Sequence, residues 1–171
     1  ARALDLLIKI LEDNNQEPMV RHEAAEAIGA IGSLESIQIL EKYLKDPVTE
    51  VAETCELALE RIKWLSLSDD VKLSKNPYNS IDPAPPLPIT NVNELKQILI
   101  NEKETLFQRY RSMFALRNLR TEEAVLALCE GLNHGSALFK HEVAFVLGQL
   151  QKEISVPYLS KSLRDCDENE M

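Results

Sequence analysis

The sequence has no apolar run approaching the roughly 20 residues that a membrane-spanning helix needs, so no such segment is expected. Aromatic residues make up only 5% of the chain, whereas Ala, Leu, Ile and Glu are abundant, which favours helices over sheets. There is no Gly-rich phosphate loop and no Ser-His-Asp arrangement, so the common nucleotide-binding and serine-hydrolase motifs are excluded.

Cysteine is scarce and charge is unbalanced. Cys55, Cys129 and Cys166 are odd in number and lack disulfide or metal spacing, which predicts reduced thiols in an intracellular, cytoplasmic protein. The net charge of −9 and the pI near 4.9 argue against direct nucleic-acid binding, which needs clustered Lys and Arg. An acidic surface suits a basic partner instead.

Hydrophobic residues recur at helical spacing along most of the chain, and no strand-length window alternates. The breaks between these stretches are short, at Glu17-Pro18, Asp46-Pro47, Arg120-Thr121 and His134-Gly135-Ser136. Thr121, followed by two glutamates, is a plausible helix start because its hydroxyl can accept unpaired backbone amides. The pattern predicts an all-α fold of antiparallel helix pairs.

These helix pairs repeat along the chain. RHEAAEAIGAIG (21–32) matches KHEVAFVLGQLQ (140–151) at a distance of 119 residues, with Gly29 on Gly148 and, further on, Asp46 on Asp165. YRSMFAL (110–116) and VAETCELAL (51–59) fit the same unit without its His. A helical hairpin repeated about every 30 residues is typical of an α-solenoid.

A proline-rich stretch divides the chain. Residues 66–90 contain five of the eight prolines, which argues against helix and predicts an extended surface linker. We therefore predict helical repeats over 1–65, a linker over 66–92 and further repeats over 93–171. LLIKILEDNNQEPM (6–19) also aligns with YLSKSLRDCDENEM (158–171), so we expect another His-Glu helix beyond Met171 and interpret the chain as the middle of a longer protein.

Two of the three histidines occur in the matched dipeptides His22-Glu23 and His141-Glu142. A single His-Glu pair is a poor chelate, because adjacent helical residues point about 100° apart. Several pairs from facing helices could instead supply imidazole and carboxylate ligands to two metal ions, and mixed nitrogen and oxygen donors suit iron. The alternative is a polar helix residue beside a helix-stabilising carboxylate. His134 is interpreted as a loop residue.

Three residues close in sequence to the His-Glu pairs have two possible roles each. Gly29 and Gly148 could leave room for a substrate near a metal, but closer approach of neighbouring helices is the preferred interpretation. Glu26 lies three residues after Glu23, so it could support the metal ligands, but an ordinary solvated charge is the preferred interpretation.

Five segments together resemble the deoxyhypusine hydroxylase (deoxyhypusine monooxygenase) family: QEPMVRHEAAEAIGAIG (16–32), DPVTEVAETCELAL (46–59), YNSIDPAPP (78–86), RYRSMFALRN (109–118) and GSALFKHEVAFVLGQLQ (135–151). The resemblance covers essentially the whole chain, including the linker. It implies a HEAT-repeat fold in two halves and four His-Glu motifs that bind two irons. The implied reaction uses O2 to hydroxylate deoxyhypusine on a eukaryotic translation factor.

The resemblance implies that His22, Glu23, His141 and Glu142 are metal ligands, as the second and third motifs. The other two motifs are not in this sequence, so we expect the isolated chain to be inactive. A metal-free HEAT-type scaffold that binds a partner protein remains the alternative. Ligand chemistry alone also leaves zinc or manganese hydrolysis open.

Overall fold

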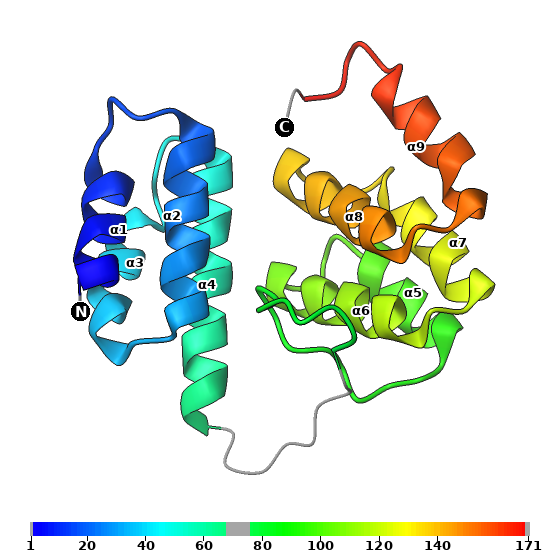
Figure 1. Ribbon diagram of the computed structural model, residues 1–171, viewed down its shortest axis with the longest axis horizontal. Coiled ribbons are helices and arrows are strands. Elements are labelled where there is room, and N and C mark those ends of the chain that lie inside the picture. The colour runs from blue at the N-terminus through cyan, green and yellow to red at the C-terminus, as the bar shows by residue number, and fades with distance from the viewer. Residues whose placement is uncertain (1, 68–75, 170–171) are drawn as a thin grey trace. The chain divides into compact units, whose positions relative to one another are not determined.

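The computed structural model describes residues 2–67 and 76–169, and all regular secondary structure within these ranges is helical (Figure 1). The predicted all-α fold is therefore confirmed. Among the described helices, none is long and apolar enough to cross a membrane. The chain separates into two units, which are described one at a time.

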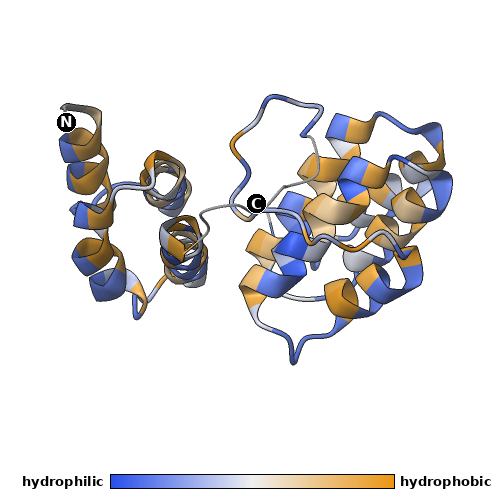
Figure 2. Ribbon diagram, turned by 90° about the horizontal axis from the view of Figure 1, so that it is seen from below, coloured by the Kyte–Doolittle hydropathy of each residue, from blue (hydrophilic) through white to orange (hydrophobic). Residues whose placement is uncertain are grey.

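The first unit contains helices α1 to α4 and residues 81–84 of the linker. Its elements are α1 (Arg2–Glu12), α2 (Pro18–Ile31), the 3-10 turn η1 (Leu34–Ser36), α3 (Ile37–Tyr43) and α4 (Thr49–Leu67). Helix α2 packs against both α1 and α4, and α3 packs against α4. Apolar and polar residues alternate around these helices, so each can bury one side (Figure 2). The fully buried residues include Leu11, Ile28, Leu40, Val51 and Ile62.

The second unit contains residues 76–80 and the chain from Pro85 onward. Its elements are α5 (Val92–Ile100), α6 (Leu106–Leu119), α7 (Glu122–Gly131), α8 (Ala137–Leu150), η2 (Glu153–Ser155) and α9 (Val156–Leu163). Asn91, Thr105, Thr121 and Ser136 each cap the helix that follows by accepting a backbone N–H. The helix start predicted at Thr121 is confirmed, since its Oγ1 accepts from the amide of Ala124 at 3.2 Å.

The helix boundaries reproduce the repeat found in the sequence. Helix α2 spans Pro18–Ile31 and helix α8 spans Ala137–Leu150, so both bounds differ by the 119 residues that separate the two sequence repeats. The bounds of η1 and η2 also differ by 119 residues. Helix α6 has the length of α2 and begins 88 residues later. The helices thus form the hairpins of an α-solenoid, as predicted.

Part of the predicted linker is buried, which differs from the expected surface path. Residues 68–75 lie outside the described residues, whereas Ala84 is fully buried and the two prolines after it are also buried. In the first unit, Arg61 Nε donates to the carbonyl oxygen of Asp82 at 3.1 Å. In the second unit, Arg111 Nε donates to that of Pro85 at 3.1 Å, and the Leu87 amide donates to the Arg111 carbonyl. Guanidinium groups therefore bond carbonyls of a segment that prolines keep from forming a helix.

Candidate functional site

His22 and Glu23 lie one turn into α2 and differ sharply in exposure. The His22 side chain is 2% exposed and that of Glu23 is 64% exposed. His22 Nε2 nevertheless lies 3.8 Å from Glu23 Oε1. A nitrogen donor and an oxygen donor therefore lie close together at the edge of the buried surface.

His141 and Glu142 occupy the equivalent turn of α8, but their exposure is reversed. Glu142 is buried, at 8% exposed, and His141 is half-buried. His141 lines a pocket of about 560 Å³ between α8, α9 and the residues that follow α9, together with Lys140, Leu159 and Cys166. The two motifs thus match in sequence, but the glutamate is the more exposed residue in the first motif and the histidine is the more exposed residue in the second.

The packing partners of the two helices differ in a way that agrees with this reversal. Helix α2 packs against α4, which follows it in the chain, whereas α8 packs against α6, which precedes it. A Cβ on Gly29 would lie 2.7 Å from the Cβ of Ala58 on α4 and 2.9 Å from its Cα, whereas a Cβ on Gly148 would meet nothing within 4 Å. We infer that the His side of such a helix faces the following hairpin and the Glu side faces the preceding one.

The interpretation of Gly29 as a contact that lets two helices approach is therefore confirmed. For Gly148 the described residues supply no such neighbour, and its role stays a prediction.

The donor types fit a metal such as iron, but each motif alone supplies too few ligands. The two motifs lie in different units, and each contributes one imidazole and one carboxylate. Among the described residues, no group of three or more His, Cys, Asp or Glu side chains could hold a metal ion. The assignment of His22, Glu23, His141 and Glu142 as ligands stays a prediction.

Glu26 is half-buried one turn after Glu23, so it is not an ordinary solvated charge. Burial, and then the negative charges of Glu23 and Asp82, raise the pKa of Glu26 from 4.5 to about 7. The charged form is disfavoured because the side chain loses water and has two acidic neighbours. Near neutral pH, Glu26 can therefore hold or release a proton beside Glu23.

Replacing Glu26 with glutamine is expected to flatten the pH dependence of stability between pH 4.5 and about 7. In this window the unfolded wild-type chain releases a proton that the folded chain retains, so its free energy of unfolding falls as pH rises. At pH ~8 the variant should be more stable by on the order of 2 kcal/mol. Urea unfolding followed by fluorescence of Trp64, the one tryptophan, reports on the unit that contains Glu26. Parallel curves for variant and wild type would show that Glu26 is ordinarily solvated.

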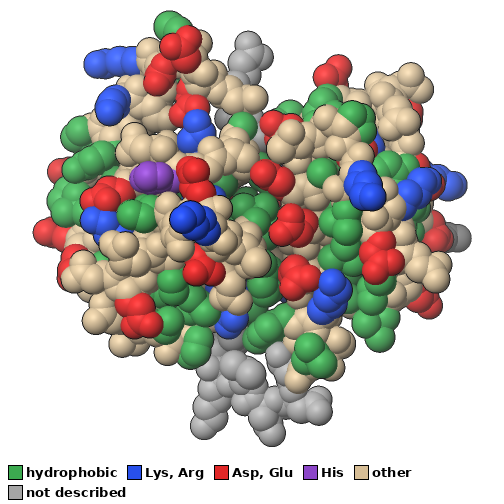
Figure 3. All heavy atoms as spheres, turned by 180° about the vertical axis from the view of Figure 1, so that it is seen from behind, with side chains coloured by type: hydrophobic (Ala, Val, Ile, Leu, Met, Phe, Trp, Pro, Cys, Tyr) green, Lys and Arg blue, Asp and Glu red, His purple; other side chains and the backbone are tan. Residues whose placement is uncertain are grey.

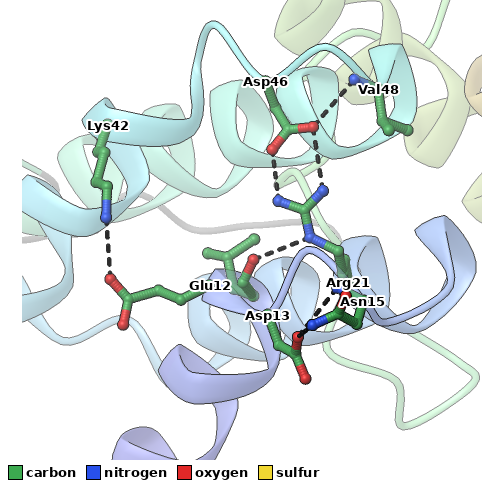
Figure 4. Close-up of polar contacts among 8 residues, drawn as sticks. Glu12, Asp13, Asn15, Arg21, Lys42, Asp46 and Val48 are labelled. Carbon is green, nitrogen blue, oxygen red and sulfur yellow. Dashed lines mark hydrogen bonds and ion pairs between the residues drawn. The ribbon is translucent and has the colours of Figure 1, made fainter.

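Sequence reasoning missed the structural role of the basic residue before each His-Glu pair. Arg21 Nε donates to the Leu11 carbonyl at 3.0 Å, and its two terminal nitrogens contact Asp46 at 3.2 and 2.5 Å (Figure 4). Lys140 makes an ion pair with Glu168 in the second unit. In both copies an aspartate follows the basic residue by 25 positions, at Asp46 and Asp165, but only Asp46 is the observed partner, since Lys140 pairs with Glu168.

His134 lies in the turn between α7 and α8, as predicted, with a side chain that is 38% exposed and 3.9 Å from Glu102. On the face drawn in Figure 3, acidic, basic and apolar side chains are interspersed. The negative charge is thus not confined to one patch of that face.

Comparison with known families places these helices in a class. A family model described as HEAT repeats matches residues 1–60, and one described as PBS lyase HEAT-like repeat matches residues 108–134. Together with the repeated hairpins, these matches define a HEAT-repeat protein.

The individual relatives are more specific. Deoxyhypusine hydroxylase of Drosophila pseudoobscura pseudoobscura is 60% identical over 170 residues, 99% of this chain and 56% of that protein. The human protein of the same name is 55% identical over 171 residues, covering 100% of this chain and 56% of the relative. The structure of human deoxyhypusine hydroxylase in complex with glycerol matches 98% of this chain and 58% of that chain, with a TM-score of 0.94. Over 99% or more of its length the chain is thus 55–60% identical to proteins named deoxyhypusine hydroxylase, and it spans about half the length of the curated relatives it matches.

Proposed function

We propose that this chain supplies two of the metal-binding helices of an iron- and O2-dependent monooxygenase that converts deoxyhypusine to hypusine on a eukaryotic translation factor. The observation that carries the proposal is the pair of His-Glu helices, α2 and α8, within a chain up to 60% identical to proteins named deoxyhypusine hydroxylase. Bound iron would supply the activation of O2 that hydroxylation of an aliphatic carbon requires.

The chain's own residues would hold and orient the metal. His22 and His141 would donate a ring nitrogen, and Glu23 and Glu142 a carboxylate oxygen. Glu23 is exposed and can move toward a metal, whereas Glu142 is already held in a buried position. Glu26 would act on Glu23 through its charge, since a proton on Glu26 removes the repulsion between these two carboxylates.

Each motif would need ligands from helices outside this chain to complete a site. We therefore propose that a protein of the relatives' full length is active and that the isolated chain is not. A metal-free scaffold would not need both donors at equivalent turns of two helices.

Incubation of the full-length protein with Fe(II), air and a deoxyhypusine-bearing protein substrate tests this function. We expect the substrate to gain the mass of one oxygen atom, and we expect metal chelation to abolish the gain. Product formation that is unchanged by chelation would contradict an iron-dependent reaction. A folded protein that binds no iron and leaves the substrate unmodified would favour the scaffold.

A further inference from the structure

The buried contact between Arg21 and Asp46 lies directly beside a proposed ligand. Its two side chains are 4% and 2% exposed, and both terminal nitrogens of the guanidinium face the two carboxylate oxygens (Figure 4). Arg21 Nε is used at the same time by the carbonyl of Leu11, at the end of α1. Asp46 is fixed in turn by the amide of Val48, at 3.0 Å. The planar guanidinium is thus held in one orientation by two segments.

The start of α2 has little else to fix it. Glu17 precedes the helix but makes no side-chain cap, and Met19 and Val20 in the first turn are 44% and 42% exposed. By contrast, α8 begins with a cap from Ser136. Arg21 is therefore the first buried residue of α2, and it immediately precedes His22.

Helix α6 shares one of the two contacts that Arg21 makes, the bond to a backbone carbonyl. Arg109 is the equivalent of Arg21, and its Nε donates to the Leu99 carbonyl at 2.9 Å, but Tyr110 follows it instead of His. The position that corresponds to Asp46 is His134 in that repeat, which is not a carboxylate. The bond to a carbonyl is thus shared by both hairpins. Lys140, which precedes the second His-Glu pair, also has a carboxylate partner, in Glu168.

We propose that Arg21 and Asp46 are positioning residues for the metal site, which rests on the proposed function of His22 as a ligand. Successive side chains on a helix are about 100° apart, so fixing the direction of Arg21 also fixes the directions of His22 and Glu23. Asp46 sets this rotation from the loop before α4. The pair keeps the imidazole nitrogen beside the carboxylate oxygen of Glu23 before metal binds.

The full-length protein with Arg21→Lys tests this role, because lysine keeps the charge but cannot contact both carboxylate oxygens in a plane. We expect Fe(II) affinity to fall about 10- to 100-fold, the usual effect of losing support around a ligand. The absorption spectrum of the Co(II)-loaded protein should also change, because the ligand geometry changes. Arg109→Lys is the matched control, and it should lower thermal stability without altering metal affinity or the Co(II) spectrum. Asp46→Asn should reproduce the Arg21→Lys effect, and Asp46→Glu should restore part of the affinity.

The outcomes separate this inference from the proposed function. A wild-type protein that binds neither Fe(II) nor Co(II) overturns both. If the wild type binds metal and Arg21→Lys lowers only thermal stability, with affinity and Co(II) spectrum unchanged, the pair is purely structural and this inference fails. Equal loss of affinity in Arg21→Lys and Arg109→Lys would also overturn it.

Discussion

Alanine at Gly29 is expected to destabilise the first unit by about 2 kcal/mol, because the added Cβ overpacks a helix interface. That Cβ would lie 2.7 Å from the Cβ of Ala58 and 2.9 Å from its Cα, so α2 and α4 would have to move apart. Alanine favours helix over glycine by roughly 0.5–1 kcal/mol, which offsets only part of this cost. Urea unfolding followed by Trp64 fluorescence measures the effect, since Trp64 lies on α4.

In the isolated chain, alanine at Gly148 is the matched control, with the opposite expected sign. A Cβ there meets nothing within 4 Å, so the gain in helix propensity should remain and stabilise α8 slightly, by up to ~1 kcal/mol. Unfolding followed by circular dichroism measures this change. A Gly29→Ala variant as stable as the wild type would show that the helices are not in backbone-level contact.

Alanine at His141 is expected to lower iron affinity and hydroxylation by more than about 100-fold in the full-length protein, since removing a ligand costs more than loss of its support. His141 is half-buried, so this change should leave helical content intact. His22→Ala should have the same effect on iron, with an added loss of stability because His22 is only 1% exposed.

His134→Ala is the control for both variants, because it removes the remaining histidine from an exposed turn. Iron content is measured by elemental analysis after gel filtration, and activity by the mass of the product. Full iron occupancy and turnover in His141→Ala would show that this residue is not a ligand.

The repeat and the helices could be predicted from the sequence because they depend on local patterns. Matching residues 119 apart anticipated the common bounds of α2 and α8, and the chemistry of Thr121 anticipated a helix cap. Close packing at Gly29 could also be predicted, because a mid-helix glycine has few other uses, and the short distance to Ala58 confirms it.

Features that depend on neighbouring elements could not be predicted in this way. His22 and His141 have matching sequence contexts, but their burial differs because α2 packs against α4 and α8 packs against α6. The burial of Ala84 depends on tertiary packing, which proline content does not encode. The spacing between Arg21 and Asp46 recurs between Lys140 and Asp165, but Lys140 pairs with Glu168, so spacing alone does not identify the partners.

The central claim is tested most directly by measuring the iron content of the full-length protein and comparing it with that of the isolated chain. The claim is that His22-Glu23 and His141-Glu142 are parts of metal sites completed by helices outside this chain. We predict two iron ions per molecule in the full-length protein and substoichiometric iron in the isolated chain, with both proteins folded. A full-length protein that binds no iron, or an isolated chain that binds two, would contradict it.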